Sequence, residues 1–143
     1  MNKVPCTVGI FAHNEEANIG KLLTNMCEQR LQTVEIREII VVSSGSFDET
    51  DSIVREYAAQ DPRIKLLVQE RREGKASAIN LFLRQMTERV LVICSADLQP
   101  ELDTIEKLIA PFADPEMGMT SSRPVPVNVP DTFMGFAAHL LWG

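Results

Sequence analysis

The chain has 143 residues, 45% of them hydrophobic and 24% charged, and this composition excludes a disordered, collagen-like or coiled-coil protein. A chain of this length forms one globular domain with a hydrophobic core of its own. The formal net charge of −6 argues against binding duplex nucleic acid, because that requires a basic face. A small anionic ligand held by a local cluster of cations remains compatible with it.

The cysteines and the apolar segments bear on the cellular compartment. Cys6, Cys27 and Cys94 follow no CxxC or metal-ligand spacing and each lies in an apolar segment, so we expect small buried side chains. The N-terminal residues lack the apolar run of a signal peptide, and no stretch approaches the ~18–20 apolar residues of a membrane span. We therefore expect a domain of the reducing cytoplasm.

Short apolar runs alternate with amphipathic stretches along most of the chain. The runs at 7–11, 39–42, 64–68 and 90–93 predict strands, and their continuous apolar character is typical of strands buried on both faces. A stripe of apolar residues at helical spacing follows each run. The stripes are Ile19, Leu22, Leu23, Met26 and Leu31; Ile53, Val54 and Tyr57; Ile79, Phe82, Leu83 and Met86; and Leu102, Ile105, Leu108 and Ile109. This alternation predicts an α/β fold, a mostly parallel sheet with helices on both faces.

The pattern changes after Met117. Residues 122–130 are proline-rich and predict extended chain, whereas Phe133–Trp142 is strongly apolar and compatible with a helix. We predict an α/β domain over 1–130 and an apolar tail over 131–143. An uncovered apolar tail is unusual for a small domain, so we expect it to be disordered or to pack on a neighbouring chain. We also expect the chain to be part of a longer protein.

Polar clusters follow each predicted strand, at 13–16, 43–46, 70–75 and 95–97. Ligands of an open parallel sheet bind beyond the carboxyl ends of its strands, which all lie at one edge. The four clusters should therefore meet at one rim of the sheet. This shared location is the main argument from the residues themselves for a binding site.

The cluster at 70–75 carries a local excess of positive charge in an acidic chain. Gly74 and Lys75 open a predicted helix, whose N-terminus attracts anions. Arg72 and Lys75 could therefore hold a phosphate or diphosphate. The alternative is a solvated run of charges.

The other clusters are ambiguous. Asp97 suits Mg²⁺ or Mn²⁺, or caps a helix that starts near Pro100. Asn14 or Glu15 could cap the first helix, and His13 is either a base or metal ligand or, as we favour, a surface or stacking residue. Ser46 begins a capping-box pattern with Glu49.

Several nucleotide-binding and catalytic motifs are absent from the sequence. The chain has no G-x-x-x-x-G-K-[ST] loop, no G-x-G-x-x-G after the first strand and no G-x-S-x-G elbow. A P-loop protein, a dinucleotide-binding Rossmann unit and an α/β-hydrolase are therefore disfavoured. A sugar-phosphate nucleotidyltransferase is disfavoured too, because no glycine-rich activating loop follows the first strand.

A set of segments in order along the chain resembles inverting family 2 glycosyltransferases. They are Phe11–Ile19 (FAHNEEANI), Val41–Thr50 (VVSSGSFDET), Arg72–Asn80 (REGKASAIN), Ser95–Asp97 (SAD), Asp114–Gly118 and Arg123–Pro126. The first four are similar to the family's P-x-Y-N-E-E-x-N-I, V-V-D-D-G-S-T-D-x-T, R-x-G-K-x-x-A-x-N and D-A-D motifs. Each match is weak alone, and their shared order and spacing make the resemblance specific.

The resemblance implies a GT-A fold that binds a nucleotide-diphospho-sugar and a divalent metal, Mn²⁺ or Mg²⁺. It implies direct displacement at the anomeric carbon by an acceptor hydroxyl, with inversion. The implied donor-site residues are Ala12, His13 and Glu15 around the nucleoside, Ser43 and Ser44 at the base, Arg72 and Lys75 at the diphosphate, and Ser95, Ala96 and Asp97, of which Asp97 ligates the metal. The implied acceptor is a glycan or lipid of cell-envelope or polysaccharide biosynthesis.

The sequence departs from the family pattern at three aspartates. Ser43 and Ser44 replace the pair in D-D-G-S, and Ser95 replaces the first acid of D-A-D. A non-catalytic nucleotide or nucleotide-sugar binding module is therefore the alternative function. The family's catalytic base lies downstream of the matched segments, so the chain alone is expected to lack it, and we name no catalytic residue. We expect a cytoplasmic location, with contact to the cytoplasmic face of the membrane through a region that follows the matched segments. We also expect self-association through the apolar tail.

Overall fold

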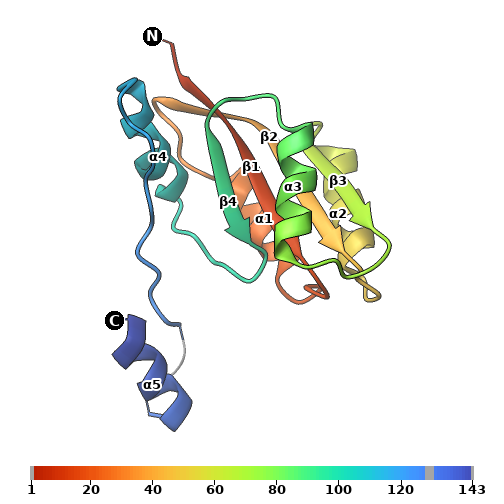
Figure 1. The fold of residues 1–143 in the computed structure, drawn as a ribbon. Helices are drawn as coiled ribbons and strands as arrows, with labels where there is room; N and C mark the ends of the chain where they lie inside the picture. The colour runs from red at the N-terminus through yellow and green to blue at the C-terminus, as the bar shows by residue number, and fades with distance from the viewer. Residues whose placement is uncertain (1, 128–130, 143) are drawn as a thin grey trace.

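The computed structural model describes residues 2–127 and 131–142. Strands and helices alternate as the sequence predicts (Figure 1). The strands are β1 (Val4–Ala12), β2 (Val34–Ser44), β3 (Ile64–Gln69) and β4 (Leu91–Ser95). The helices are α1 (Ile19–Cys27), α2 (Thr50–Gln60), α3 (Lys75–Gln85), α4 (Thr104–Ile109), the 3-10 turn η1 (Ala110–Ala113) and α5 (Phe133–Trp142).

The strands form one parallel sheet in the order β3-β2-β1-β4. All four arrows point toward the bottom of Figure 1, so their carboxyl ends share one rim. This confirms the predicted parallel α/β fold. The observed strands differ from the predicted apolar runs by one to several residues at their ends, because parallel pairing continues into flanking residues. Strand β4 instead begins one residue later than predicted, at Leu91.

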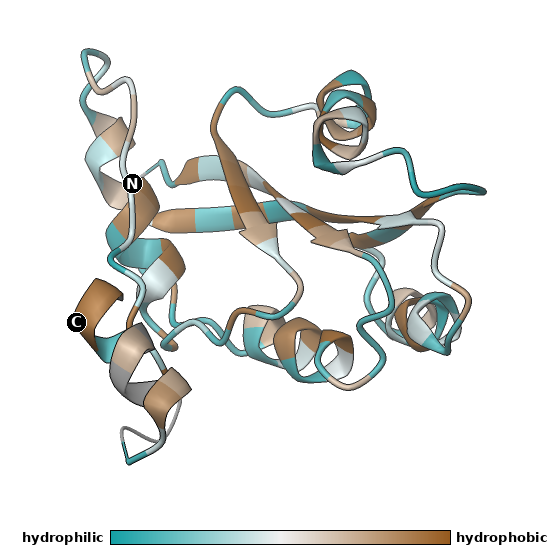
Figure 2. Ribbon diagram, turned by 60° about the horizontal axis from the view of Figure 1, so that its bottom comes forward, coloured by the Kyte–Doolittle hydropathy of each residue, from teal (hydrophilic) through white to brown (hydrophobic). Residues whose placement is uncertain are grey.

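The sheet has a hydrophobic layer on each face. Val8 and Ile10 of β1 point to the larger core, beneath α1, α2 and α4, whereas Phe11 points to the opposite face. There α3 covers the sheet with Ala78 and Phe82 (Figure 2). Helices therefore cover both faces, as predicted.

The position of α3 depends on a glycine in the central strand. A Cβ atom on Gly9 would lie 2.8–2.9 Å from the ring of Phe82, closer than side chains pack. Gly9 thus allows the fully buried Phe82 ring to sit directly on β1, edge-on to Phe11 at 5.8 Å. This contact fixes α3, and with it Lys75 at the rim.

Two details of the predicted core are wrong. Cys6 and Cys94 are buried, and burial raises the pKa of their thiols to about 12 and about 11. Cys27, however, is exposed at the end of α1, where its thiol donates to Asp61 at 3.6 Å. Leu83 is also exposed, because α3 turns Ala78 and Phe82 to the sheet and leaves Leu83 on its outer side.

The apolar tail is helical, as the sequence allowed. Figures 1 and 2 place α5 beyond α4 and away from the sheet. Phe133, Met134, Leu140 and Leu141 are all exposed there. The predicted boundary near residue 130 lies outside the described residues. Within the described part of the chain, no helix is both long enough and apolar enough to cross a membrane.

Candidate functional site

The turns after all four strands contribute to one pocket of about 290 Å³ at the rim. Register explains the convergence, since Ala12 pairs with Ser43 of β2 and Phe11 pairs with Ser95 of β4. The lining residues are Phe11, Ala12, His13, Glu15, Val42, Ser44, Arg72, Gly74, Lys75, Ala78, Ser95, Ala96 and Asp97. Every residue that the sequence assigned to the donor site lines this pocket except Ser43.

The β1–α1 and β2–α2 turns are cross-linked by hydrogen bonds between backbone and side chains. The backbone N–H of Asn14 donates to the Ser46 hydroxyl at 3.1 Å, and that of Phe47 donates to the Asn14 side-chain oxygen at 3.0 Å. The N–H of Glu15 donates to the Thr50 hydroxyl at 2.8 Å. Asn14 has a φ of 52°, which asparagine tolerates better than most side chains. The two turns therefore behave as one braced unit.

This bracing replaces the predicted helix caps. The Ser46 hydroxyl accepts from no backbone N–H at the start of α2, and α2 begins only at Thr50, whose backbone N–H donates to Asp48 at 3.0 Å. Partial burial raises the pKa of Asp48, but hydrogen bonds from Thr50 outweigh it and hold the pKa below its ordinary value. The predicted capping box is therefore wrong, because the Ser46 hydroxyl is taken by the neighbouring turn.

Glu15 does not cap α1 through its side chain either. Its backbone carbonyl accepts from the N–H of Ile19 at 2.9 Å, and its carboxylate accepts from the Asn18 side chain at 2.9 Å. Asn14 reaches across to the β2–α2 turn. Neither residue of the predicted cap therefore performs that role.

Both ring nitrogens of His13 have partners within the protein. Nδ1 lies 2.7 Å from the backbone carbonyl of Ser44, which can only accept, so Nδ1 carries the proton. Nε2 lies 3.4 Å from the side-chain nitrogen of Asn14, which donates. These contacts leave the ring itself, rather than a free nitrogen, as the surface that His13 offers to the pocket. They favour the stacking role over a base or a metal ligand.

The hydroxyls of the two serines at the end of β2 form hydrogen bonds within the protein. Ser43 is fully buried and its hydroxyl donates to the Ser46 oxygen at 2.8 Å. The Ser44 hydroxyl accepts from the backbone N–H of Glu73 at 3.2 Å. Ser43 is therefore a structural part of the turn, and Ser44 reaches the pocket as part of its wall.

The β3–α3 turn packs closely against the β2–α2 turn at a glycine. Gly45 has a φ of 62°, and a Cβ there would lie 2.8 Å from the Arg71 carbonyl carbon. Its backbone N–H donates to the Gln69 carbonyl at 2.9 Å. Gly74, with a φ of 88°, then turns the chain into α3. These two glycines bring Arg72 and Lys75 to the pocket.

The charged residues of the pocket have few protein partners. Lys75 Nζ donates to the Ser95 hydroxyl at 3.2 Å. In residues 2–127 and 131–142, the side chains of Arg72 and Asp97 make no hydrogen bond or ion pair. All three charged side chains are exposed. Two cations and one carboxylate thus face solvent together. An external anion would pair with Arg72 and Lys75, whereas the Asp97 carboxylate would need a cation.

Asp97 is not a helix cap, because α4 begins only at Thr104. Among the described residues, no group of three or more His, Cys, Asp or Glu side chains could hold a metal ion. The pocket does offer the Asp97 carboxylate beside the Ser95 hydroxyl. This donor set fits Mg²⁺ or Mn²⁺ only when a bound diphosphate supplies further oxygens, which is how such ions commonly bind.

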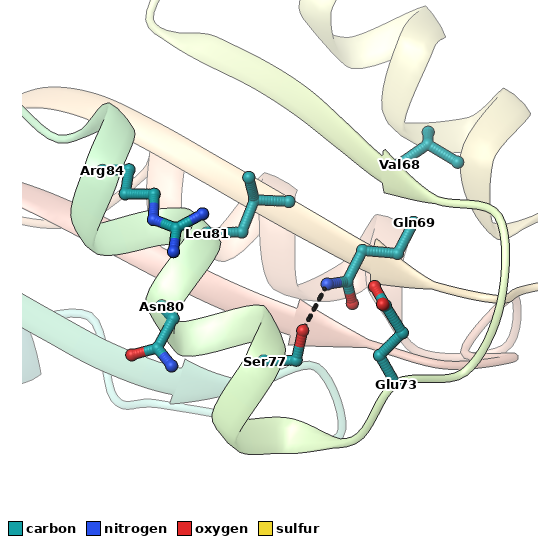
Figure 3. Close-up of a pocket in the computed structure, with 7 residues that line it drawn as sticks. All are labelled: Val68, Gln69, Glu73, Ser77, Asn80, Leu81 and Arg84. Atoms are coloured by element: carbon teal, nitrogen blue, oxygen red, sulfur yellow. Dashed lines mark hydrogen bonds between the residues drawn. The ribbon is translucent and has the colours of Figure 1, made fainter.

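A second hollow, of about 510 Å³, lies on the other side of α3 (Figure 3). It is lined by Val68, Gln69, Glu73, Ser77, Asn80, Leu81 and Arg84. Gln69 donates there to the Ser77 hydroxyl at 3.0 Å. In the part of the chain that the structure describes, this hollow is lined by β3, α3 and the turn between them, so it lacks the convergence of all the strand ends.

Some lining residues were not identified from the sequence. Phe11, Val42 and Ala78 belong to the core layer beneath α3, and they form the floor of the pocket. The alternation of side chains in a strand could have found two of them, because Phe11 and Val42 face the same side of the sheet as α3.

Fold and site together define a protein of the glycosyltransferase class. The model of glycosyl transferase family 2 matches residues 7–140, and the chain belongs to this family. The resemblance seen in the sequence is thereby confirmed.

Known relatives support the same assignment. An uncharacterized glycosyltransferase of Bacillus subtilis (strain 168), YkcC, is 35% identical over 105 residues, which cover 71% of this chain and 32% of the relative. The dolichyl-phosphate beta-glucosyltransferase ALG5C of Trichomonas vaginalis is 31% identical over 116 residues, covering 75% of this chain and 33% of the relative.

A solved structure of a similar protein agrees with the fold. The mannosyltransferase PcManGT from Pyrobaculum calidifontis, in complex with GDP-Man and Mn²⁺, has a TM-score of 0.72 and 36% identity. The match covers 82% of this chain and 34% of that one. The GT-A fold expected from the sequence is confirmed, and the chain spans about a third of the length of these relatives.

Proposed function

We propose that the chain is the donor-binding part of a glycosyltransferase that moves a sugar from a nucleotide-diphospho-sugar to an acceptor hydroxyl with inversion. The observation that carries the proposal is the pocket at the rim, where Arg72, Lys75 and Asp97 face solvent in a pocket that the His13 ring also lines. The bound GDP-Man and Mn²⁺ of the similar mannosyltransferase support it.

The proposed chemistry follows from the charges of the pocket. The acceptor hydroxyl loses its proton to a general base, a role for which no residue of this pocket is assigned, as its oxygen forms a bond to the anomeric carbon. The bond from that carbon to the diphosphate oxygen breaks, so negative charge grows on the diphosphate. Arg72 and Lys75 stabilise that charge, and the N-terminus of α3 adds its dipole. A divalent cation held by Asp97 and the diphosphate would supply further charge neutralisation.

Each residue on the donor side has a proposed role. His13 packs against the nucleoside, with Ala12 and Glu15 beside it, and Ser44 forms the adjoining wall. Ser95 and Ala96 line the diphosphate end, where Ser95 orients the Lys75 ammonium group through its hydroxyl. These roles require no large movement of the braced turns, so the nucleoside end is preorganised.

The acceptor is the less constrained part of the proposal. A relative whose name is that of a dolichyl-phosphate glucosyltransferase favours a lipid acceptor. A lipid acceptor would place the chain at the face of a membrane, which we propose to be the cytoplasmic one. The α/β domain over 1–130 would bind the donor, and the apolar tail over 131–143 would lead toward the acceptor side, through self-association or membrane contact.

Titration calorimetry with GDP, UDP and CDP, with and without Mn²⁺, tests the donor site. We expect binding that is strengthened by Mn²⁺, and loss of that strengthening in Asp97→Asn, because the carboxylate supplies the protein's charged ligand. Glu101→Gln, in the same β4–α4 connection but outside the pocket, is the matched control and should keep it. Absence of binding to every nucleotide would reject the proposal.

A module that binds nucleotide-sugars without turning them over is the second candidate. Among the described residues, Glu15 and Asp97 are the carboxylates that line the pocket, and Glu15 already accepts from Asn18. A pocket that offers few free carboxylates for acid–base or metal chemistry favours binding without turnover. Release of GDP or UDP from the matching nucleotide-sugar, followed by chromatography, separates the two candidates. Turnover that depends on Asp97 would exclude the module. Tight binding without turnover would favour the module only when it is measured on a protein that also contains the region downstream of the matched segments, with acceptors present.

A further inference from the structure

One large hydrophobic side chain of the rim is an aromatic ring that lies almost fully in solvent. Phe47, in the turn between β2 and α2, is 86% exposed. Exposing an apolar ring to this extent contributes little to the stability of the fold. The ring nevertheless has a fixed base, since its backbone N–H donates to the Asn14 side chain at 3.0 Å. An uncovered aromatic ring on an anchored backbone next to a pocket is a surface available to a ligand.

Phe47 is linked to the pocket through His13. The two ring centroids lie 6.3 Å apart with an interplanar angle of 80°. A flat group laid on one ring of such a pair meets the other ring along its own edge, so the two rings form a corner. Since both nitrogens of His13 have protein partners, this corner offers π-surface rather than hydrogen bonds.

The strand order and two hydrogen bonds place His13 and Lys75 at different ends of the pocket. His13 is bonded to the end of β2, whereas Lys75 is bonded to Ser95 at the end of β4, next to Asp97. Strand β1 separates these two ends in the sheet. A nucleoside diphosphate with its phosphates at Lys75 and Asp97 would therefore direct its base toward His13 and Phe47.

Hydrogen-bond recognition of the base is poorly supplied at this end. The Ser43 hydroxyl is buried and donates to Ser46. The Ser44 hydroxyl accepts from the Glu73 backbone, so of the two serines only Ser44 can still donate to a base, through its single O–H. Stacking on aromatic rings tolerates every base, because each has a π-face. A purine presents a larger face than a pyrimidine.

We infer that Phe47 and His13 form a stacking platform for the nucleobase, so that this chain prefers purine to pyrimidine nucleotides by contact area rather than by hydrogen bonds. The inference rests on the proposed function and names the specificity-determining residue of its donor site. Phe47 is the part of the platform that no expectation from the sequence included.

Binding of GDP, UDP and pyrophosphate to wild-type protein, Phe47→Ala and Phe47→Tyr tests the platform. We expect GDP to bind about tenfold more weakly to Phe47→Ala, because one stacked base is lost. The preference for GDP over UDP should fall, and pyrophosphate, which has no base, should bind as before. Phe47→Tyr should keep the GDP affinity. Phe133→Ala, which removes a similarly exposed ring from α5, is the matched control and should change nothing.

The outcomes separate this inference from the proposed function. Unchanged GDP affinity in Phe47→Ala overturns the platform, while Mn²⁺-dependent GDP binding would still support the donor site. Equal weakening of GDP and pyrophosphate also overturns it, because the ring would then act on the shape of the turn. Failure of the wild-type protein to bind any nucleotide overturns both proposals. An unchanged melting temperature in Phe47→Ala shows that the fold is intact.

Discussion

The two halves of the rim differ in how their polar groups are satisfied. At the ends of β1 and β2, backbone N–H groups donate to side chains of the opposite turn, as Asn14 does to Ser46 and Glu15 to Thr50. At the ends of β3 and β4, Arg72 and Asp97 make no hydrogen bond or ion pair within the described residues. The first half is held together by its own hydrogen bonds, whereas Arg72 and Asp97 of the second half would gain partners from a ligand.

This difference teaches how a binding site can be preorganised without being strained. In the braced half, hydrogen bonds within the protein hold the His13 ring and the Phe47 backbone in place before any ligand binds. The charged half keeps its cations in water until an anion replaces that water, so its charges cost the fold little. Substitutions in the two halves should therefore have different effects on stability and on binding.

The largest effect is expected where the halves meet, at Gly45. Its φ of 62° and the closeness of the Arg71 carbonyl carbon, 2.8 Å from an added Cβ, leave no room for a side chain. Gly45→Ala should lower the free energy of unfolding by about 2–4 kcal/mol and weaken nucleotide binding as Arg72 shifts. Urea unfolding and calorimetry measure the two effects. Gly118→Ala, where nothing lies within 4 Å of the added Cβ, is the control.

Arg72→Ala should weaken ligand binding by the charged half of the rim and leave the braced half unchanged. We expect nucleotide diphosphate affinity to fall about 10- to 100-fold, because a charge-assisted hydrogen bond is lost. The melting temperature should stay the same, and the difference from wild type should shrink at high salt. Arg84→Ala, on the side of α3 that faces the second hollow, is the matched control. An equal loss in Arg84→Ala would contradict the assignment of the site to the rim.

A smaller effect, on stability alone, is expected at the opposite end of β3. Hydrogen bonds from the Arg63 side chain lower the pKa of Asp61 from 3.8 to about 2. Since the pKa of the folded state is depressed, its stabilisation is complete above about pH 4 and is lost as the pH falls through about 2. Asp61→Asn should cost about 1–2 kcal/mol at pH 7, allowing for partial exposure of the pair, and almost nothing near pH 2.

Urea unfolding across this pH range measures the effect of Asp61, and nucleotide affinity at pH 7 should not change. Asp103→Asn provides the comparison, because the ion pair of Asp103 with Lys107 is more exposed, and a smaller change is expected. If the difference in the free energy of unfolding between wild type and Asp61→Asn stayed constant down to pH 2, the charge of Asp61 would not be the cause. The different hydrogen bonds of the amide would then explain the loss of stability.

The sequence by itself determined the order of elements and the rim. Apolar runs and stripes have local periods, so the strands at 7–11 and 39–42 and the helix that begins at Lys75 could be predicted without knowing their neighbours. Parallel topology then brought Arg72, Lys75 and Asp97 to one edge. Boundaries shifted, because pairing with a neighbouring strand decides where a strand ends.

Only the tertiary structure decided which polar groups are free. Ser46 was predicted to cap α2, but its hydroxyl accepts from Asn14, 32 residues earlier in the chain. Ser43 was assigned to the base, yet it is buried, and Phe47 reaches the rim because Asn14 holds its backbone. A hydroxyl or an amide can form hydrogen bonds of similar energy with several partners, and the local sequence does not show which of them it takes. Burial and long-range contact choose among them, because an unpaired polar group inside the fold is costly.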